Sequence, residues 1–243
     1  MINQETITGM VLSAMPIGDY DKRLVILTKE KGKISAFARG ARKPNCALLA
    51  CSQPFSFGEF TIYQGRDSYT VSQANITNYF TELRDDLDTV YYGLYFCEFA
   101  DYITRENVNA SDILKLLYVS LRALAKKTIP IELIRYIFEL KMMVLNGEAP
   151  QMFECVKCRT EKELTLFSST RGGLICADCN SKMPGVIKIG ASTIYTMQFI
   201  ITSSIEKLYS FTVSDEVLRE LQICMKQYIE TYVDYKFKSL FVL

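Results

Sequence analysis

Residues 11–44 have the sequence VLSAMPIGDYDKRLVILTKEKGKISAFARGARKP, and this stretch decides the N-terminal fold. Together with the residues just before it, it contains three runs rich in apolar and β-branched residues, at 5–17, 23–28 and 34–41. The charged GDYDK loop separates the first two runs. The turn KEKGK separates the second from the third, and its Gly32 is free to adopt a positive φ. We therefore expect three successive strands joined by short connections.

Two further runs extend this β-domain. Residues 55–64 (FSFGEFTIYQ) and 68–74 (SYTVSQA) predict a hairpin around a turn at residues 65–67. Five strands in roughly 75 residues, with glycine at the bends, suit a small closed barrel, and the OB-type barrel is the five-stranded version. We expect residues 1–80 to form an OB-fold domain, a type of barrel that commonly binds nucleic-acid strands.

The pattern changes from strand to helix after residue 78. Helical spacing then places a mainly apolar set of residues near one stripe: Leu87, Val90, Tyr91, Leu94, Tyr95 and Glu98, continued by Phe99 and Ile103. A second helix is expected after Ser111 and Asp112, which can cap it, and it runs through residue 127. A third helix is predicted between Pro130, which suits its first turn, and Gly147, which suits its end.

Four of the eight cysteines form two identical pairs, Cys155-x-x-Cys158 and Cys176-x-x-Cys179. In C-x-x-C both sulfurs can reach one ion from a single turn, and the segment between the pairs predicts a strand, a turn and a second strand. Four thiolates close a tetrahedral shell and leave no position for water or substrate. We therefore expect one structural zinc ion in a zinc ribbon. Buried thiols, disulfides or an iron–sulfur cluster are the alternatives for the same residues.

The sequence thus predicts a multi-domain α+β protein in which the ribbon is inserted into a helical domain. Two more helices are expected after the ribbon, at about 190–211 and 214–237. The expected domains are the OB-fold at 1–80, the first helical part at 81–150, the four-cysteine zinc ribbon at 151–184 and the second helical part at 185–243.

Several functional classes are disfavoured by what the sequence lacks. It contains no histidine, which removes the commonest general base and the usual nucleophilic triads, and it contains no P-loop or dinucleotide fingerprint. The acidic cluster at Asp85, Asp86 and Asp88 is expected to be the first turn of a helix rather than a magnesium site. A secretory signal and an apolar membrane span are also missing, so we expect a cytoplasmic protein that is not an enzyme.

Charge is concentrated near the N-terminus. Residues 22–43 carry eight basic residues and one acidic residue, whereas residues 81–150 carry eight basic and eleven acidic residues. Strand alternation places Phe37 beside Arg39 on one face of the third strand, and Tyr20 can add a second aromatic ring. Such a surface suits a phosphate backbone with stacked bases. The alternative is a solvated hairpin with Phe37 inside the barrel.

The candidate nucleic-acid contacts are the cations of this stretch and its aromatic residue: Lys22, Arg23, Lys29, Lys31, Lys33, Phe37, Arg39, Arg42 and Lys43. The lysines at 29, 31 and 33 rank second, because lysines in turns are often only solvated.

Four segments together resemble the bacterial recombination and DNA-repair protein O (RecO) family: residues 11–44, QPFSFGEFTIYQGRDSYTVSQA (53–74), YYGLYFCEFADYI (91–103) and the CVKC and CADC pairs. The zinc ribbon occurs in some members of that family and is degenerate in others. The resemblance implies an OB-fold, a helical bundle and a ribbon in a bacterial, nucleoid-associated protein. It also implies binding to single- and double-stranded DNA and annealing of complementary strands. The resemblance further implies that the protein works with RecR. Together they load recombinase onto DNA coated by single-stranded-DNA-binding protein.

The resemblance also implies that the helical part contacts the acidic C-terminal tail of single-stranded-DNA-binding protein. The candidates for this contact are chosen by charge alone: Lys115, Arg122, Lys126, Lys127 and Arg135. Two other functions stay open from the residues themselves. One is a zinc-ribbon adaptor that binds only protein, and the other is a metal-dependent nuclease.

Overall fold

The computed structural model describes residues 4–66, 68–179 and 185–241. The chain forms two compact units, Met1–Lys126 with Phe237–Leu243, and Lys127–Lys236. Residue 67 of the predicted turn and residues 180–184 of the predicted ribbon lie outside the described residues. The four domain boundaries expected from the sequence therefore stay a prediction.

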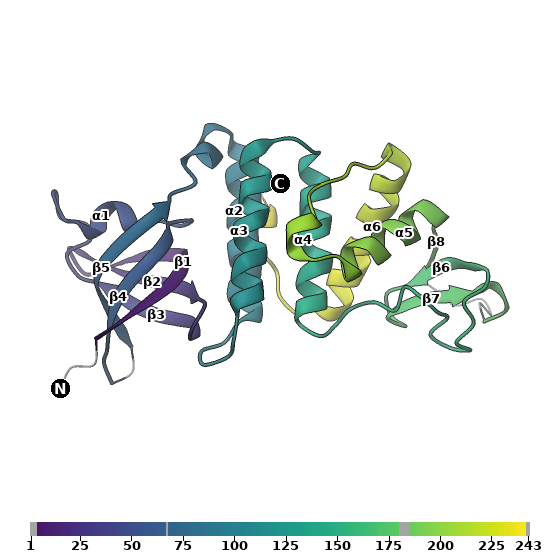
Figure 1. Cartoon of the computed structure of the whole chain (residues 1–243), viewed down its shortest axis with the longest axis horizontal. Helices are drawn as coiled ribbons and strands as arrows, with labels where there is room; N and C mark the ends of the chain where they lie inside the picture. Colours follow the sequence, from purple (N-terminus) through teal and green to yellow (C-terminus); the bar gives the residue numbers. More distant parts are fainter. Residues whose placement is uncertain (1–3, 67, 180–184, 242–243) are drawn as a thin grey trace. The chain divides into compact units, whose positions relative to one another are not determined.

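The first unit begins with a closed five-stranded barrel (Figure 1). Its strands are β1 (Gln4–Ile17), β2 (Asp21–Thr28), β3 (Gly32–Ala38), β4 (Phe57–Gln64) and β5 (Tyr69–Asn78). They follow the order β1-β2-β3-β5-β4, and β4 pairs with β1 to close the ring. All neighbours are antiparallel except β3 and β5, which are parallel. This confirms the predicted OB-like barrel.

Strand alternation determines the barrel core. In β3, Ile34, Ala36 and Ala38 are buried, while the residues between them are only partly buried. Phe37 therefore lies on the outside of the barrel and is not a core residue. The strand is shorter than the predicted 34–41, because the next residues form a turn in which the Gly40 N–H donates to Asp21 Oδ1 at 2.7 Å. The short helix α1 (Leu48–Cys51) follows this turn.

Two helices complete the first unit, α2 (Leu87–Ile103) and α3 (Ser111–Lys126), after a short 3-10 turn, η1 (Thr81–Asp85). They run side by side next to the barrel (Figure 1). The bounds of α2 agree with the sequence, but the single stripe expected for it is wrong. Leu87 is 73% exposed, whereas Tyr92 and Phe96, outside the stripe, are buried. The reason is that α2 contacts β1, β2 and α3, and also the C-terminal turn η4 (Lys238–Phe241), so partners cover it on several sides.

The second unit contains α4 (Ile131–Leu145), α5 (Ala191–Thr202), α6 (Asp215–Tyr232) and a small three-stranded sheet. The sheet has the order β7-β6-β8, with β6 (Leu164–Ser168), β7 (Gly173–Cys176) and β8 (Val186–Lys188). The short 3-10 turns η2 (Ala177–Cys179) and η3 (Ile205–Lys207) follow β7 and α5. A small sheet between α4 and α5 in the sequence confirms the predicted insertion.

Two helix ends in this unit differ from the prediction. The helix expected at 190–211 ends at Thr202, where the buried Lys141 Nζ donates to the carbonyls of Ile200, Ile201 and Ser203 at 3.2, 2.9 and 2.7 Å. An ammonium group at the last carbonyls of a helix satisfies acceptors that have no partner within the helix. The helix expected at 214–237 ends at Tyr232. None of the described helices has the length and apolar character that crossing a membrane requires.

Candidate DNA surface and metal centre

The four paired cysteines converge on one point. All four Sγ atoms lie within 4.8 Å of one another, and those of Cys158 and Cys176 are 3.6 Å apart. A tetrahedral zinc site with Zn–S bonds of about 2.3 Å separates its sulfurs by about 3.8 Å. The four residues therefore have the donor type and the spacing to hold one ion between the loop at 155–160 and the end of β7.

Backbone N–H groups favour the thiolate form of one cysteine of this cluster. Burial raises the pKa of the Cys155 thiol, but N–H groups of Cys158, Cys176 and Lys157 donate to its sulfur and bring the pKa down to about 6. Hydrogen bonds with the Cys158 and Cys176 thiols raise the pKa of Cys179 to about 12. Binding of an ion must therefore displace protons from this cluster.

Three of the four cysteine side chains are buried, and only Cys158 is exposed. Four thiolates fill a tetrahedral shell, so an ion held here has no open position for substrate. Such an ion ties the loop at 155–160 to β7. The Val156 N–H also joins this loop to the Leu174 carbonyl at 2.9 Å.

The other candidate ligands do not form a second cluster. Cys51, Cys97 and Cys224 are buried and Cys46 is half-buried. Asp86 precedes α2 and accepts a hydrogen bond from Thr89 Oγ1 at 2.6 Å. Within residues 4–66, 68–179 and 185–241, the paired cysteines are the one group of metal-binding side chains that comes together.

Several of the predicted DNA contacts gather at one end of the barrel. The β1–β2 loop and the turn after β3 meet there, because the Arg42 N–H donates to the Tyr20 carbonyl at 2.8 Å. The Arg42 guanidinium donates to the Gly18 carbonyl at 3.1 Å, and Lys43 Nζ lies 5.1 Å from the centroid of the Tyr20 ring. Arg39, Arg42 and Lys43 are exposed, as is the Tyr20 ring. Loops that are separate in the sequence thus form one cationic and aromatic surface.

A row of side chains on the outer face of the barrel continues this surface. Strand register pairs Met15 with Arg23, Arg23 with Phe37, and Phe37 with Thr70 across β1, β2, β3 and β5. Met15 is 63% exposed, and Arg23 is held by Ser35, whose Oγ accepts from its Nε at 2.9 Å. We call Tyr20, Arg23, Phe37, Arg39, Arg42 and Lys43 the barrel-end patch. Met15 and Thr70 lie beside it and were not predicted, because only the strand register brings them there.

Lys22 does not belong to this patch, although the sequence placed it among the first candidates. Its side chain is buried, and Nζ donates to the carbonyl and to the Oγ of Ser52 at 3.0 and 3.1 Å. Burial lowers the pKa of this amine. The ammonium group therefore fastens the segment after α1 to the barrel wall and is not available at the surface.

The turn between β2 and β3 lies at the other end of these strands from the barrel-end patch. Two of its three lysines have partners in the first unit. Lys31 Nζ lies 3.0 Å from Glu5 Oε1, and Lys33 Nζ lies 2.8 Å from Asp101 Oδ1 on α2. Lys29 is exposed. This turn, whose lysines were the second-ranked candidates for DNA contact, is docked on the helical part of its own unit.

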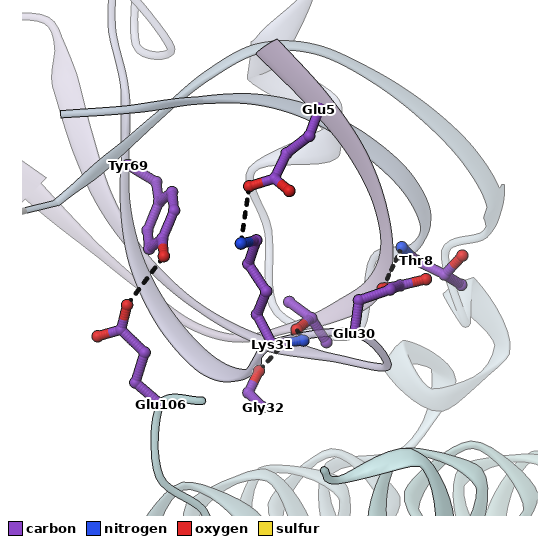
Figure 2. Close-up of polar contacts among 8 residues, drawn as sticks. Glu5, Thr8, Glu30, Lys31, Gly32, Tyr69 and Glu106 are labelled. Atoms are coloured by element: carbon purple, nitrogen blue, oxygen red, sulfur yellow. Dashed lines mark hydrogen bonds and ion pairs between the residues drawn. The ribbon is translucent and has the colours of Figure 1, made fainter. Parts of the chain in front are cut away.

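The contacts that dock the β2–β3 turn involve the connection between α2 and α3 as well as the barrel (Figure 2). We call this region the joint of the first unit. Tyr69 Oη donates to Glu106 Oε1 at 3.0 Å, and the Thr8 N–H donates to Glu30 Oε2 at 3.0 Å. Burial, followed by this hydrogen bond to Glu106, raises the pKa of Tyr69 to about 12. The backbones of Gly32 and Glu106 also form an isolated antiparallel β-bridge at this joint.

The five candidates for a partner contact have three different environments. Lys115, Arg122 and Lys126 are exposed and recur at helical spacing along one face of α3. We call these three residues the α3 stripe. Arg135 on α4 is partly buried, and its Nε lies 2.7 Å from Oε1 of the buried Glu139. Lys127 is exposed and has a left-handed backbone conformation directly after α3.

Comparison with known proteins agrees with this architecture. Family models for the N-terminal and the C-terminal parts of recombination protein O match residues 1–80 and 84–241. The DNA repair protein RecO of Alkaliphilus metalliredigens is 36% identical over 93% of this chain and 92% of that protein. The proteins of the same name from Acetivibrio thermocellus and Bacillus subtilis are 32% and 31% identical. These matches cover 96% and 95% of this chain, and 93% and 90% of those proteins.

Proposed function

The chain belongs to the RecO family of DNA repair proteins, and from this we propose that it is a DNA-binding recombination mediator and not an enzyme. In this role it binds single- and double-stranded DNA, anneals complementary strands, and works with a RecR-like protein. Together they load recombinase onto DNA coated by single-stranded-DNA-binding protein. The observation that carries the DNA-binding part is the barrel-end patch, which joins four cations to two aromatic rings on the outside of an OB-like barrel.

The chemistry of the patch suits a nucleic-acid strand. Arg39, Arg42 and Lys43 present positive charge from a turn, and Arg23 adds a fourth cation beside Phe37. Cations that neutralise phosphates release counterions, and aromatic rings accept stacked bases of any identity. Contacts of this type position a backbone without selecting a sequence.

Annealing follows from the same physics. Two complementary strands repel each other through their phosphates, and a cationic surface lowers this repulsion while base pairing stabilises the product. The proposed reaction breaks no covalent bond, so it needs no general base and no nucleotide hydrolysis.

We assign zinc to the cysteine cluster and a structural role to the ion. Thiolate is the soft donor that zinc accepts, and the four sulfurs already lie near tetrahedral spacing. The small β6–β7–β8 sheet has little apolar core of its own, since its buried cluster consists of Ile175 and three of the cysteines. When bound, the ion holds this sheet together.

The α3 stripe is the proposed contact for an acidic protein tail, such as that of single-stranded-DNA-binding protein. Lys115, Arg122 and Lys126 lie on one exposed face of a helix of the first unit. We leave Arg135 out of this proposal, because its guanidinium is paired with the buried Glu139. Cations in a row favour an extended anionic segment and make its binding sensitive to salt.

The experiment is fluorescence anisotropy of a labelled single-stranded oligonucleotide across a salt series. The wild type is compared with the Arg39→Ala/Arg42→Ala variant, and with Arg122→Ala/Lys126→Ala, which removes the same charge from the α3 stripe. The first variant should weaken binding of every oligonucleotide sequence alike and reduce the salt slope by about one to two units. The second should leave DNA binding nearly unchanged and weaken binding of an acidic peptide.

Equal weakening of DNA binding by the two variants would mean that net charge, and not the barrel-end patch, controls the affinity. If the folded, metal-loaded chain does not bind DNA even at low salt, the DNA-binding proposal is wrong, and the protein-only adaptor becomes the better description.

A further inference from the structure

A groove in the second unit has no role in the proposed DNA mechanism. Two hollows of about 740 and about 480 Å³ lie along adjacent faces of α5. Both are lined by Ala191 and by Tyr195, whose side chain is 69% exposed between them. We call these two hollows the Tyr195 groove.

The lining of the groove is mainly apolar and aromatic. Phe199 and Phe211 pack edge to face in the larger hollow, with ring centroids 5.1 Å apart. Phe153, 45% exposed, lines the smaller one together with Leu164 and Ile194. Large exposed aromatic side chains that surround a hollow cost solvation free energy unless another molecule covers them. Shape and composition therefore indicate a docking surface for apolar side chains.

Among the described residues that line the two hollows, the charged side chain is a carboxylate. Within the described parts of the chain, no lysine or arginine lines either hollow, whereas Glu161 lines the smaller one. Asp215 and Glu216 are exposed in the first turn of α6, directly after Ser214, which lines the larger one. Carboxylates in these places repel the phosphates of nucleic acid and the side chains of an acidic peptide. The described lining of the groove thus carries no positive charge, in contrast to the barrel-end patch and the α3 stripe.

We propose that the Tyr195 groove docks a protein segment that combines aromatic or large aliphatic side chains with lysine or arginine residues beside them. The apolar side chains occupy the two hollows on either side of Tyr195, and the cations lie against Glu161 and the first turn of α6. This interaction goes beyond the proposed DNA-binding function, because it uses another surface and a partner of opposite charge.

The hydroxyl groups of the lining support a stable groove. Thr196 Oγ1 donates to the Ser192 carbonyl at 2.8 Å, and the Ser214 side chain accepts from the Val217 N–H at 3.4 Å to cap α6. Each bond lies within one helix or its cap, so these lining hydroxyl groups are ordered before a ligand arrives.

The test uses the full chain, labelled with ¹⁵N and loaded with metal, and three synthetic peptides of equal length. The first repeats Lys-Leu-Phe, the second has glutamate in place of lysine, and the third has serine in place of leucine and phenylalanine. We expect the first peptide alone to shift the amide resonances of residues 191–199 and 211–217. Tyr195→Ala and Ala191→Trp should each weaken its binding by about tenfold or more.

Two matched variants separate a specific site from general stickiness. Ile223→Ala removes another exposed apolar side chain, 46% exposed on α6 and outside the groove, and should leave the affinity unchanged. Asp215→Lys/Glu216→Lys should weaken the lysine peptide and strengthen the glutamate peptide. The proposal is overturned if the glutamate peptide binds the wild type as tightly, if shifts occur elsewhere, or if no peptide shifts these resonances. None of these outcomes bears on DNA binding, which the anisotropy experiment tests separately.

Discussion

The turn between β2 and β3 provides the most demanding test of how the first unit is held together. Gly32 has a φ of +67°, and a Cβ atom added there would lie 2.2 Å from the Arg105 carbonyl oxygen and 2.5 Å from that of Val108. The turn is joined to the same segment by two backbone hydrogen bonds, Lys33 N–H to Arg105 O at 3.2 Å and Asn107 N–H to Lys31 O at 2.8 Å. Gly32→Ala must therefore push these segments apart.

The expected loss of stability can be worked from three contributions. A left-handed backbone costs an L-residue about 1 to 2 kcal/mol. Two stretched or broken backbone hydrogen bonds cost about 1 kcal/mol each. We therefore expect Gly32→Ala to lower the free energy of unfolding of the first unit by about 3 to 4 kcal/mol.

The chain offers a matched control for this effect. Gly18 also has a positive φ, of +53°, but a Cβ atom there would meet no atom within 4 Å. Gly18→Ala should cost only the backbone term of about 1 to 2 kcal/mol. Urea unfolding followed by circular dichroism measures both variants, and hydrogen exchange of the barrel amides assigns the loss to the first unit. If the two variants lose equal stability, the close approach at Gly32 does not constrain the joint and the reasoning fails.

Two further predictions concern the metal centre and the alkaline limit of stability. Cys176→Ser should lose the bound metal and lower the melting temperature, whereas Cys46→Ser, outside the cluster, should keep both; unchanged metal content by mass spectrometry would contradict the ligand assignment. Because burial and Glu106 raise the pKa of Tyr69 to about 12, the folded chain holds this proton more tightly than the unfolded chain. The resulting stabilisation is complete below about pH 10 and is lost as the pH rises towards 12. Tyr69→Phe should therefore lose less stability than the wild type over that interval in urea titrations, and equal losses would refute this cause.

The metal centre shows what short-range spacing can predict. A C-x-x-C pair confines its two sulfurs to one turn, and an intervening hairpin returns the second pair to the first. The structure has this hairpin as β6 and β7, and the four sulfurs converge as expected. The identity of the ion depends on chemistry that spacing does not contain, and it stays a prediction.

The cations of the first unit show what short-range sequence patterns do not predict. Lys22, Lys31 and Arg39 are equally basic in the sequence, but one is buried on Ser52, one is paired with Glu5 and one is exposed. Partners that lie 26 to 30 positions away decide these outcomes, and charge counts along the chain carry no information on them. The prediction of a single stripe on α2 was wrong for the same reason. Periodicity indicated one face, but several distant segments pack against this helix and bury other faces.

The sequence by itself determined the order and type of the main strands and helices, the barrel, the inserted sheet and the pairing of the four cysteines. Each of these follows from local periodicity, turn chemistry or ligand spacing over a few residues. Only the tertiary structure decided which cations remain at the surface, where they gather, and that a groove with acidic edges forms around Tyr195. Those features depend on contacts between segments distant in sequence, whose free energies are set by burial and by partners that no short stretch of the chain specifies.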